Sequence, residues 1–419
     1  MRTNIKNSLR ILATCSTMLW VGQGIAADCS SNPANPNGKA SKLQNALQQA
    51  TNTGKPLRLT GTYYIGTDKD ATDGKQILKG INVTLRKDLI VDATGARFIA
   101  KADLDGDLFS FDTKNNDNVC GNKDQLADFT WKGGDFDMSR AKVSTVVPIT
   151  RLTPAGREGK DKTADALSIR GVVNTTNYHK LNELVIERIN FYGTRNNSDP
   201  FYEAGGDSGI LMTGALKATI RYNNFYGVRD AAVYLSAGGD NGQFGDHFTI
   251  HDNYVERAFD SFTSKRGADN IVMRNNVLKD VVVGLSTKSV FRGWQATNVK
   301  IRDNTIDNAM RAISVETTNN VTIEDNEINN LGDVVAAQTS ASKANFNAYS
   351  DAFEGISLNG VQGTNIVKNN KIRGVTGSSR ERSTTAWGIV HRSYEGRNTK
   401  NISKINNTFS NVDKWSKYL

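Results

Sequence analysis

Residues 301–330, IRDNTIDNAMRAISVETTNNVTIEDNEINN, contain nearly the same phrase twice, I-R-D-N-T-I from residue 301 and I-E-D-N-E-I from residue 323. Both copies place an apolar residue first and sixth and an asparagine fourth. A phrase that returns at an interval of 22 residues is typical of a repeat architecture, in which each unit supplies one structural coil.

Five more copies of this frame occur along the chain. They are IERINF, IRYNNF, IHDNYV, MRNNVL and VKNNKI, and they begin at residues 186, 220, 250, 273 and 367. The intervals between successive copies vary from 22 to 44 residues. A fixed minimum with an irregular excess predicts one coil per copy, with loops inserted on one side of the coil. The fourth place is asparagine in six of the seven copies: Asn223, Asn253, Asn276, Asn304, Asn326 and Asn370.

A second apolar run lies within each interval, for example SGILMTG around residue 210 and RAISVET around residue 313. Its period of two predicts a strand, and no helical period appears beyond residue 164. Short strands joined by Asn- and Gly-rich turns cannot bury their own apolar side, so the coils must stack about 4.8 Å apart around one core. The pattern predicts a parallel β-helix. Asparagine suits its corners because it tolerates a left-handed backbone and can bond to the next coil, so we interpret the asparagines as structural.

The N-terminal part predicts a cap for this stack. A helix over residues 41–53 would present Leu43, Ala46, Leu47 and Ala50 on one side, and Gly54 would end it. A strand up to residue 65 follows. Such a helix would cover the open end of the core and its strand edges. The segment ADFTWKGGDFDM, residues 127–138, predicts a further strand with a Gly-Gly turn, so coils should begin before residue 186.

The first 26 residues have the features of an export signal. Arg2, Lys6 and Arg10 precede an apolar run over residues 11–21, and small residues permit cleavage after Ala26. We therefore expect a periplasmic or secreted protein whose residues 27–419 form a single domain. No later segment is apolar for long enough to span a membrane, so we expect no membrane insertion.

The net charge indicates which class of ligand the protein binds, and the cysteines indicate whether disulfide bonds are expected. The whole sequence carries a formal net charge of +9, and it stays basic without the signal. Among polyanions outside the cytoplasm we expect an acidic polysaccharide and no nucleic acid. Cys29 and Cys120 are too few for a disulfide scaffold, although an oxidising compartment would let them pair. The four histidines show no zinc-binding spacing.

The predicted helix with GTYYI, the FTWKGGDFD strand and the repeated frame together resemble the pectin-lyase-like superfamily of right-handed β-helix proteins. The resemblance covers nearly the whole chain after the signal. It implies an all-β fold, a right-handed single-stranded parallel β-helix with an N-terminal capping helix. It also implies a polysaccharide ligand, but the superfamily contains lyases, hydrolases, epimerases and adhesins, so the reaction stays open.

Alternation within the second run predicts which side chains point outward and stack between coils. With residues such as Leu285 and Ile313 inward, the outward column continues over every coil. It consists of Arg170, Thr213, Ser236, Lys265, Lys288, Glu316, Asn359 and Arg392. Arg266 and Arg292 lie beside this column in the sequence, and Tyr234 lies one coil before Lys265.

This column predicts chemistry on a uronate polymer. Two ammonium groups roughly 5 Å apart on adjacent coils disfavour each other's charge, which makes a neutral amine available as a base. We expect β-elimination with Lys265 as the base and Lys288 or Arg292 neutralising the sugar carboxylate. The predicted substrate-binding residues are Arg266, Tyr234, Ser236, Glu316, Asn359 and His251.

A closer resemblance is local. Residues 260–289, DSFTSKRGADNIVMRNNVLKDVVVGLSTKS, resemble a stretch of chondroitinase B and of alginate lyases of that type. On this match Lys265 takes the place of the base and Lys288 lies near the place of the family's arginine, although Thr-Lys-Ser replaces the family's Arg-His-Gly. The resemblance implies a calcium-binding acid at Asp260, and the predicted metal ligands are Asp260 and Asp230.

Two alternatives stay open from the sequence. The first is hydrolysis by paired carboxylates, with Asp230 and Asp260 on adjacent coils and Asp207, Asp240 and Asp246 nearby. Carboxyl groups about 5 to 5.5 Å apart would retain configuration, and a separation of about 6.5 to 9.5 Å would invert it.

The second alternative is a surface protein that binds a polysaccharide without cleaving it. The basic column would act with loop aromatics such as Tyr226, Phe346 and Tyr349, and insertions over residues 334–351 and 376–386 would wall a groove. His247 and His251 would lie near that groove.

Overall fold

The structure is a computed structural model. The predicted signal at residues 1–26 lies outside the residues that it describes, so the signal stays a prediction. The described residues are 29–66, 80–102, 104, 106–113, 120, 126–141, 147–148, 165–173, 178–179, 181–193, 203–204, 208–237, 245–265, 267–288, 295–332, 352–375 and 385–418.

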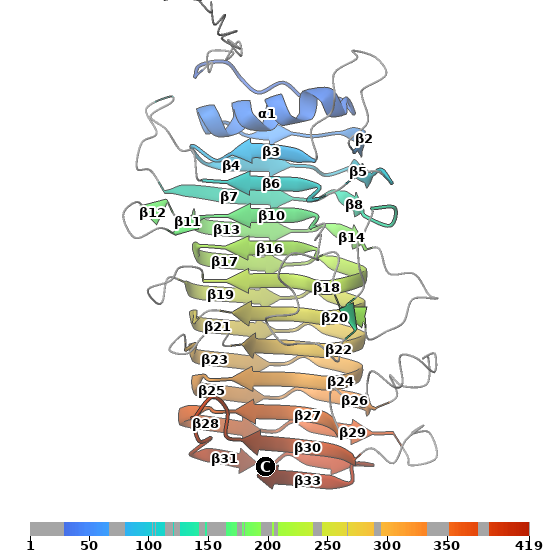
Figure 1. Cartoon of the computed structure of the whole chain (residues 1–419), viewed down its shortest axis with the longest axis vertical. Coiled ribbons are helices and arrows are strands. Elements are labelled where there is room, and N and C mark those ends of the chain that lie inside the picture. The colour runs from blue at the N-terminus through green and yellow to red at the C-terminus, as the bar shows by residue number, and fades with distance from the viewer. Residues whose placement is uncertain are drawn as a thin grey trace, which may run out of the picture.

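The described residues form one stack of coils, and a helix covers the N-terminal end of this stack (Figure 1). Two large sheets run the length of the stack, and neighbouring strands within them are parallel. The first sheet has 11 strands: β1 (Leu57–Arg58), β4 (Leu89–Asp92), β7 (Ala127–Lys132), β13 (Leu181–Glu187), β17 (Ala215–Arg221), β19 (Asp246–His251), β21 (Asp269–Arg274), β23 (Thr297–Arg302), β25 (Asn319–Glu324), β28 (Gln362–Lys368) and β31 (Ile402–Ile405).

The second sheet has 18 strands and wraps around the rest of the coil. Its strands are β2 (Gly61–Ile65), β3 (Ile81–Thr84), β5 (Ala96–Ala100), β6 (Phe109–Asp112), β8 (Asp135–Asp137), β10 (Leu167–Arg170), β14 (Asn190–Tyr192), β16 (Ile210–Thr213), β18 (Asn224–Ser236), β20 (Tyr254–Lys265), β22 (Val277–Lys288), β24 (Thr305–Glu316), β26 (Glu327–Leu331), β27 (Ala352–Asn359), β29 (Lys371–Gly374), β30 (Thr385–Arg392), β32 (Thr408–Ser410) and β33 (Lys414–Tyr418). Two short antiparallel pairs lie outside both sheets: β9 (Val147–Pro148) with β15 (Glu203–Ala204), and β11 (Val172–Val173) with β12 (Tyr178–His179).

Each coil has three sides. A typical coil runs along β21, turns at Asn275 and Asn276, and continues as β22, which bends at Asp280 where φ is 53°. The bend divides the long strands β18, β20, β22 and β24 into two sides. We call the side formed by their C-terminal halves, together with β6, β10, β16, β27 and β30, the third face. The alternation predicted for this face is confirmed, because Phe262, Leu285 and Ile313 pair in register and are fully buried.

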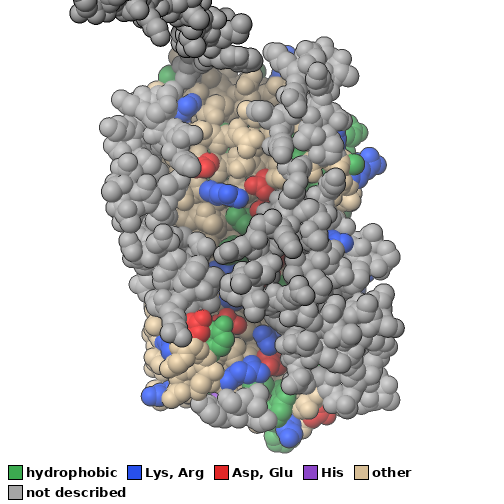
Figure 2. Space-filling view, viewed as in Figure 1, with side chains coloured by type: hydrophobic (Ala, Val, Ile, Leu, Met, Phe, Trp, Pro, Cys, Tyr) green, Lys and Arg blue, Asp and Glu red, His purple; other side chains and the backbone are tan. Residues whose placement is uncertain are grey.

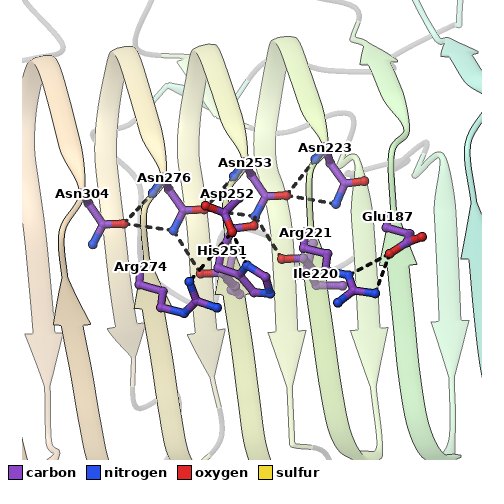
Figure 3. Close-up of polar contacts among 11 residues, drawn as sticks. Glu187, Ile220, Arg221, Asn223, His251, Asp252, Asn253, Arg274, Asn276 and Asn304 are labelled. Carbon is purple, nitrogen blue, oxygen red and sulfur yellow. Dashed lines mark hydrogen bonds and ion pairs between the residues drawn. The ribbon is translucent and has the colours of Figure 1, made fainter.

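The corner between the first and second sides carries the predicted asparagine ladder (Figure 3). Each ladder side chain bonds to the coils on both sides. The Nδ2 of Asn276 donates to the Ile250 carbonyl at 3.0 Å and to Asn304 Oδ1 at 3.0 Å. Its Oδ1 accepts the Asn253 backbone N–H at 3.1 Å. The asparagines are therefore structural, as predicted.

Two details of the ladder differ from the sequence prediction. The left-handed residue is the one before each ladder asparagine, such as Asp252 with φ of 55° and Asn275 with φ of 53°. The ladder position is instead selected by its buried hydrogen bonds. A seventh ladder asparagine, Asn407, accepts the backbone N–H of Asn370. The frame missed it because Lys404 occupies the first, apolar place.

The predicted cap is confirmed as α1 (Ala40–Thr53), which buries Leu43, Ala46, Leu47 and Ala50 against the first coil. Gly54 ends the helix in the left-handed region with φ of 69°, and its N–H donates to the Ala50 carbonyl. The helix begins after Lys39 without a side-chain cap, so the expected start at Ser41 is one residue late.

Other features of the chain agree with a covered, continuous stack. The strand and Gly-Gly turn predicted near residue 130 are present as β7 and β8, and β7 pairs with β13, so coils do begin before residue 186. Cys29 and Cys120 form a disulfide bond. None of the helices in the described part of the chain is both long and apolar enough to cross a membrane.

Candidate functional site

The predicted outward column exists on the third face. Backbone register places Ser236 beside Lys265 and Lys265 beside Lys288 on successive coils. Farther along, Glu316 lies beside Asn359, and Asn359 lies beside Arg392. Parallel pairing sets these positions, so the sequence alternation was sufficient to find them.

A second charged column lies five residues earlier on the same strands, and the sequence reading missed it. In register its positions are Asp260, Val283, Arg311, Glu354 and Trp387. Strict alternation would have turned Asp260 inward with Phe262, but its carboxylate pairs with the outward Lys288. The sequence does contain a signal for this second column. A charged residue recurs two places before each of the apolar residues Phe262, Ile313 and Ile356.

Small side chains separate the two columns. We call the eight polar members of the two columns from β20 to β30 the charged strip: Asp260, Lys265, Lys288, Arg311, Glu316, Glu354, Asn359 and Arg392. Between them lie Thr263, Ser286, Ser314 and Ser357, which are all buried. The Oγ of Ser314 is buried and has no hydrogen-bond partner among the described residues.

Lys288 crosses the strip to the preceding coil. Its ammonium nitrogen lies 2.5 Å from the carboxylate of Asp260, whose side chain is 7% exposed. This pairing stabilises the charged form of Lys288. It offsets part of the mutual effect predicted for the ammonium groups of Lys265 and Lys288. The second oxygen of Asp260, Oδ1, is buried without a hydrogen-bond partner among the described residues.

Lys265 has a different contact. Its ammonium nitrogen lies 4.2 Å from the centre of the Tyr234 ring, on the coil before, as the sequence predicted for that residue. A cation over an aromatic ring is held by the negative face of the ring. The contact therefore favours the ammonium form of Lys265 in the free protein.

Glu316 is the acid of the strip with a perturbed titration. Burial raises the pKa of its carboxyl, and the carboxylates of Asp260 and Glu395 add to that effect. The nearby Lys288 and Arg311 act in the opposite direction but do not cancel it. Glu316 can therefore keep a proton at a pH at which an exposed glutamate has lost it.

Glu354 has a lowered pKa, in contrast to Glu316. Its side chain is 1% exposed, its Oε2 lies 2.8 Å from Arg311 Nε, and its Oε1 accepts from Arg392. Burial alone would raise the pKa of Glu354, but the two guanidinium groups outweigh burial and hold it below its usual value. Arg392 also donates to Ser357 Oγ at 3.0 Å and to Asn359 Oδ1 at 3.2 Å. These bonds fix the C-terminal end of the strip.

The remaining predicted site residues have varied positions. Arg266 and Arg292 lie outside the described residues, as do Asp207, Asp240, Phe346 and Tyr349. Ser236 is in the predicted column but is fully buried.

His251 lies on β19 in the first sheet, away from the third face, so the expectation that it lies near a groove there is not met. Its Nδ1 is 2.5 Å from Asp252 Oδ2 (Figure 3). Its ring also meets the ring of Tyr222 edge to face. His247 also belongs to β19.

The calcium site predicted at Asp260 and Asp230 lacks a fitting donor set. Calcium takes six to eight oxygen ligands, whereas Asp260 is occupied by an ammonium group. Asp230 lies on β18, one coil away, where its charge acts on Asp165. In the described part of the chain no group of three or more His, Cys, Asp or Glu could hold a metal ion. Calcium binding stays a prediction, and no chemical step is derived from it.

Charge on this molecule is mixed. On the face shown in Figure 2, basic and acidic side chains lie next to one another in both the upper and lower coils. The charged strip itself has four basic and three acidic members, and one of the acids, Glu316, holds its proton more strongly than usual. The strip therefore carries an excess of positive charge. Its basic and acidic side chains are interspersed, whereas the sequence predicted a more uniformly basic column.

Residues 208–414 match the family described as right handed beta helix region. This part of the chain is a right-handed β-helix. The match includes the coils that carry the charged strip, and the fold implied by the sequence resemblance is confirmed. No curated protein matches the chain.

Solved structures with a similar fold share little sequence with the β-helix described here. The A-module of mannuronan C-5 epimerase AlgE4 from Azotobacter vinelandii is 14% identical, with 92% of this chain and 96% of that chain covered and a TM-score of 0.45. An exopolygalacturonase from Thermotoga maritima is 13% identical, with 93% and 89% covered and a TM-score of 0.46. PfbA, a surface adhesin of Streptococcus pneumoniae, is 12% identical, with 92% of each chain covered and a TM-score of 0.41. At these identities the likeness concerns the fold alone.

Proposed function

We propose that this protein acts outside the cytoplasm on an acidic polysaccharide and cleaves it by β-elimination on the charged strip. The observation that carries the proposal is the arrangement of Lys265, Lys288 and Asp260. Two cationic side chains lie on adjacent coils, and one of them is fixed by a buried carboxylate. The predicted export signal, which lies outside the described residues, gives the location.

In this mechanism the sugar carboxylate binds next to Lys288. The ammonium group, held by Asp260, neutralises the carboxylate and so acidifies the hydrogen on the adjacent carbon. The amine of Lys265 takes that proton. The electron pair left behind forms a carbon–carbon double bond, and the glycosidic oxygen leaves with its bonding pair and is then protonated. Arg292, one of the predicted neutralising residues, keeps that role as part of the proposal.

The contact with Tyr234 has a consequence for the base. A lysine carries its proton at neutral pH unless its surroundings disfavour the charge, and the Tyr234 ring favours it. Elimination should therefore accelerate as the solution becomes alkaline and Lys265 loses its proton. The neighbouring Lys288 assists this loss only in part, because Asp260 compensates its charge.

Hydrolysis is the second candidate, and Glu316 is the observation that favours it. A carboxyl with a raised pKa near the Asp260 carboxylate is the combination that acid-assisted glycoside cleavage uses. Glu316 would protonate the leaving oxygen, with Asp260 as the ionised partner. In this pair Glu316 takes the place of Asp230, the partner of Asp260 in the sequence-based alternative, and the rate should fall as Glu316 loses its proton in base.

One experiment separates these functions. The mature protein is incubated with a panel of uronate polymers while ultraviolet absorbance and reducing ends are followed over a range of pH. Absorbance from an unsaturated sugar, rising with pH, supports elimination. Reducing ends without absorbance, declining with pH, would show hydrolysis instead. Polymer binding without either signal would leave a binding protein and overturn cleavage.

A further inference from the structure

A pocket of about 460 Å³ opens among the N-terminal coils, away from the charged strip. It lies at the corner where β7 passes into β8. Its wall includes Gly95, Arg97, Lys132, Gly133, Asp135 and Arg188. We call it the glycine pocket. Its volume is within the range of about 300 to 1,000 Å³ that is usual for small-molecule sites.

The corner beside the pocket carries no side chains at this point. In the later coils the left-handed corner position carries a side chain, as in Tyr222 and Asp252. A chain of backbone hydrogen bonds places Gly133 and Arg188 in the same column, since each corner N–H donates to the next coil. At Gly133 and Gly134 the column continues with φ of 75° and 101° but without side chains. A Cβ at Gly133 would meet Thr94 of the preceding coil at 3.0 Å, so the close approach of that coil accounts for glycine at this position.

The wall of the pocket is cationic. Arg97, Lys132 and Arg188 line it together with one acid, Asp135, whose Oδ1 accepts a hydrogen bond from the Asn190 amide at 2.8 Å, and the charge of Lys132 also acts on Asp92. The guanidinium of Arg97 is about half exposed and lies 3.6 Å from Asp137, and that of Arg188 lies 6.0 Å from the centre of the Tyr222 ring. Both contacts leave donors available, because a guanidinium has five N–H groups. Such a site suits a ligand that has one anionic group and several hydroxyls.

We propose that the glycine pocket binds a single uronate unit of an acidic glycan. The sugar carboxylate would lie against Arg188 and Lys132, and Asp135 would accept hydrogen bonds from sugar hydroxyls. The choice of a sugar over another anion rests on the proposed function. The cationic character of the pocket is independent of that function. The strands of the pocket are three coils from β20, roughly 14 Å along the stack.

Gly95 offers a substitution that fills the pocket without disturbing its neighbours. Its φ is 82°, and a Cβ built on it meets no heavy atom within 4 Å. Asparagine tolerates this backbone, so Gly95→Asn should fold and place an amide in the cavity. Gly396 has φ of 76° and equally open surroundings at the other end of the chain, so Gly396→Asn is the matched control.

The test is a calorimetric titration of the mature protein with galacturonate, galactose and inorganic sulfate. We expect galacturonate to bind more tightly than either of the others, and Gly95→Asn to weaken it at least tenfold while Gly396→Asn does not. Equal binding of galactose or of sulfate would overturn the proposal, as would full binding by Gly95→Asn.

Lys265→Ala separates this inference from the proposed function. The variant should keep galacturonate binding at the pocket even where it loses polymer cleavage. If Lys265→Ala abolished galacturonate binding while Gly95→Asn retained it, the sugar would lie on the charged strip and the pocket proposal would be wrong. If no polymer were cleaved but Gly95→Asn still abolished galacturonate binding, the cleavage proposal alone would fail.

Discussion

The ammonium nitrogen of Lys288 lies 2.5 Å from the carboxylate of Asp260, on the preceding coil. The two residues belong to different columns of the third face, so their pairing spans the width of the strip. Because Asp260 is nearly buried, it holds the charge of Lys288 at one place on the strip instead of leaving it on a mobile side chain. Substrate positioning should depend on this acid although Asp260 itself need not touch the substrate.

Asp260→Asn tests that dependence. The substitution keeps size and removes the charge that fixes Lys288, so we expect kcat on a cleaved uronate polymer to fall at least tenfold. KM should stay equal or decrease, because the strip gains net positive charge. Glu256→Gln is the control, since Glu256 also pairs with a lysine of the next coil, Lys279, but on another side of the coil. A KM increase with unchanged kcat would contradict a positioning role.

Glu354→Gln should be severely destabilising. The carboxylate is buried between two arginines, and breaking a buried pair leaves uncompensated charge at a cost of about 3 to 5 kcal/mol. Glu327→Gln removes a similar contact to Arg373 at the exposed surface, where about 1 kcal/mol or less is expected. Urea unfolding of both variants measures the difference. Equal losses would mean that Glu354 is not buried as described.

Removing a neutral side chain of the asparagine ladder should also lower the free energy of unfolding. Asn276→Ala leaves the buried N–H of Asn253 and the carbonyl of Ile250 without partners, at about 1 to 3 kcal/mol for each unsatisfied group. Asn298 belongs to an exposed row of asparagines and has φ of 55°, so Asn298→Gly removes its side chain without backbone strain. We expect the first variant to unfold at clearly lower urea concentration and the second to change little. Similar midpoints would show that the ladder is not stabilising.

The sequence predicts the stack well and the site only in part, for a physical reason. Phe262, Leu285 and Ile313 repeat because each coil must bury the same side, and parallel register then fixes the outward Lys265 and Lys288. Local alternation carries no information about positions that depart from it, such as Asp260, and none about how far a long side chain reaches along the surface. The pairing of Lys288 with Asp260 and the burial of Glu354 depend on both.

The glycine pocket was equally hidden. From the sequence, Gly133 and Gly134 predict a turn, and the structure confirms this turn. Only the stacked corners show that a side chain is missing there relative to Tyr222 and Asp252 in later coils.

Glu316→Gln should change stability in a pH-dependent manner. Burial raises the folded-state pKa of Glu316 above its ordinary value of 4.5, so the folded protein favours the protonated carboxyl. The stability that this carboxyl contributes is complete below pH 4.5 and is lost as pH rises through the folded-state pKa. Glutamine resembles the protonated form at every pH. We expect equal unfolding midpoints for variant and wild type near pH 4 and a more stable variant at pH 8; a variant less stable at pH 8 would contradict the sign.

The riskiest prediction concerns Lys265 itself. If the protein cleaves by elimination, Lys265→Ala should lower kcat by at least the factor of about 10² that is typical of losing a general base. The residual activity should also lose its rise toward alkaline pH, because the titrating amine is gone. Tyr234→Leu is the complementary variant, since removing the ring that favours the ammonium form should shift the rise in activity to lower pH. Full activity in Lys265→Ala, with an unchanged pH profile, would remove Lys265 from the mechanism and leave the coil stack untouched.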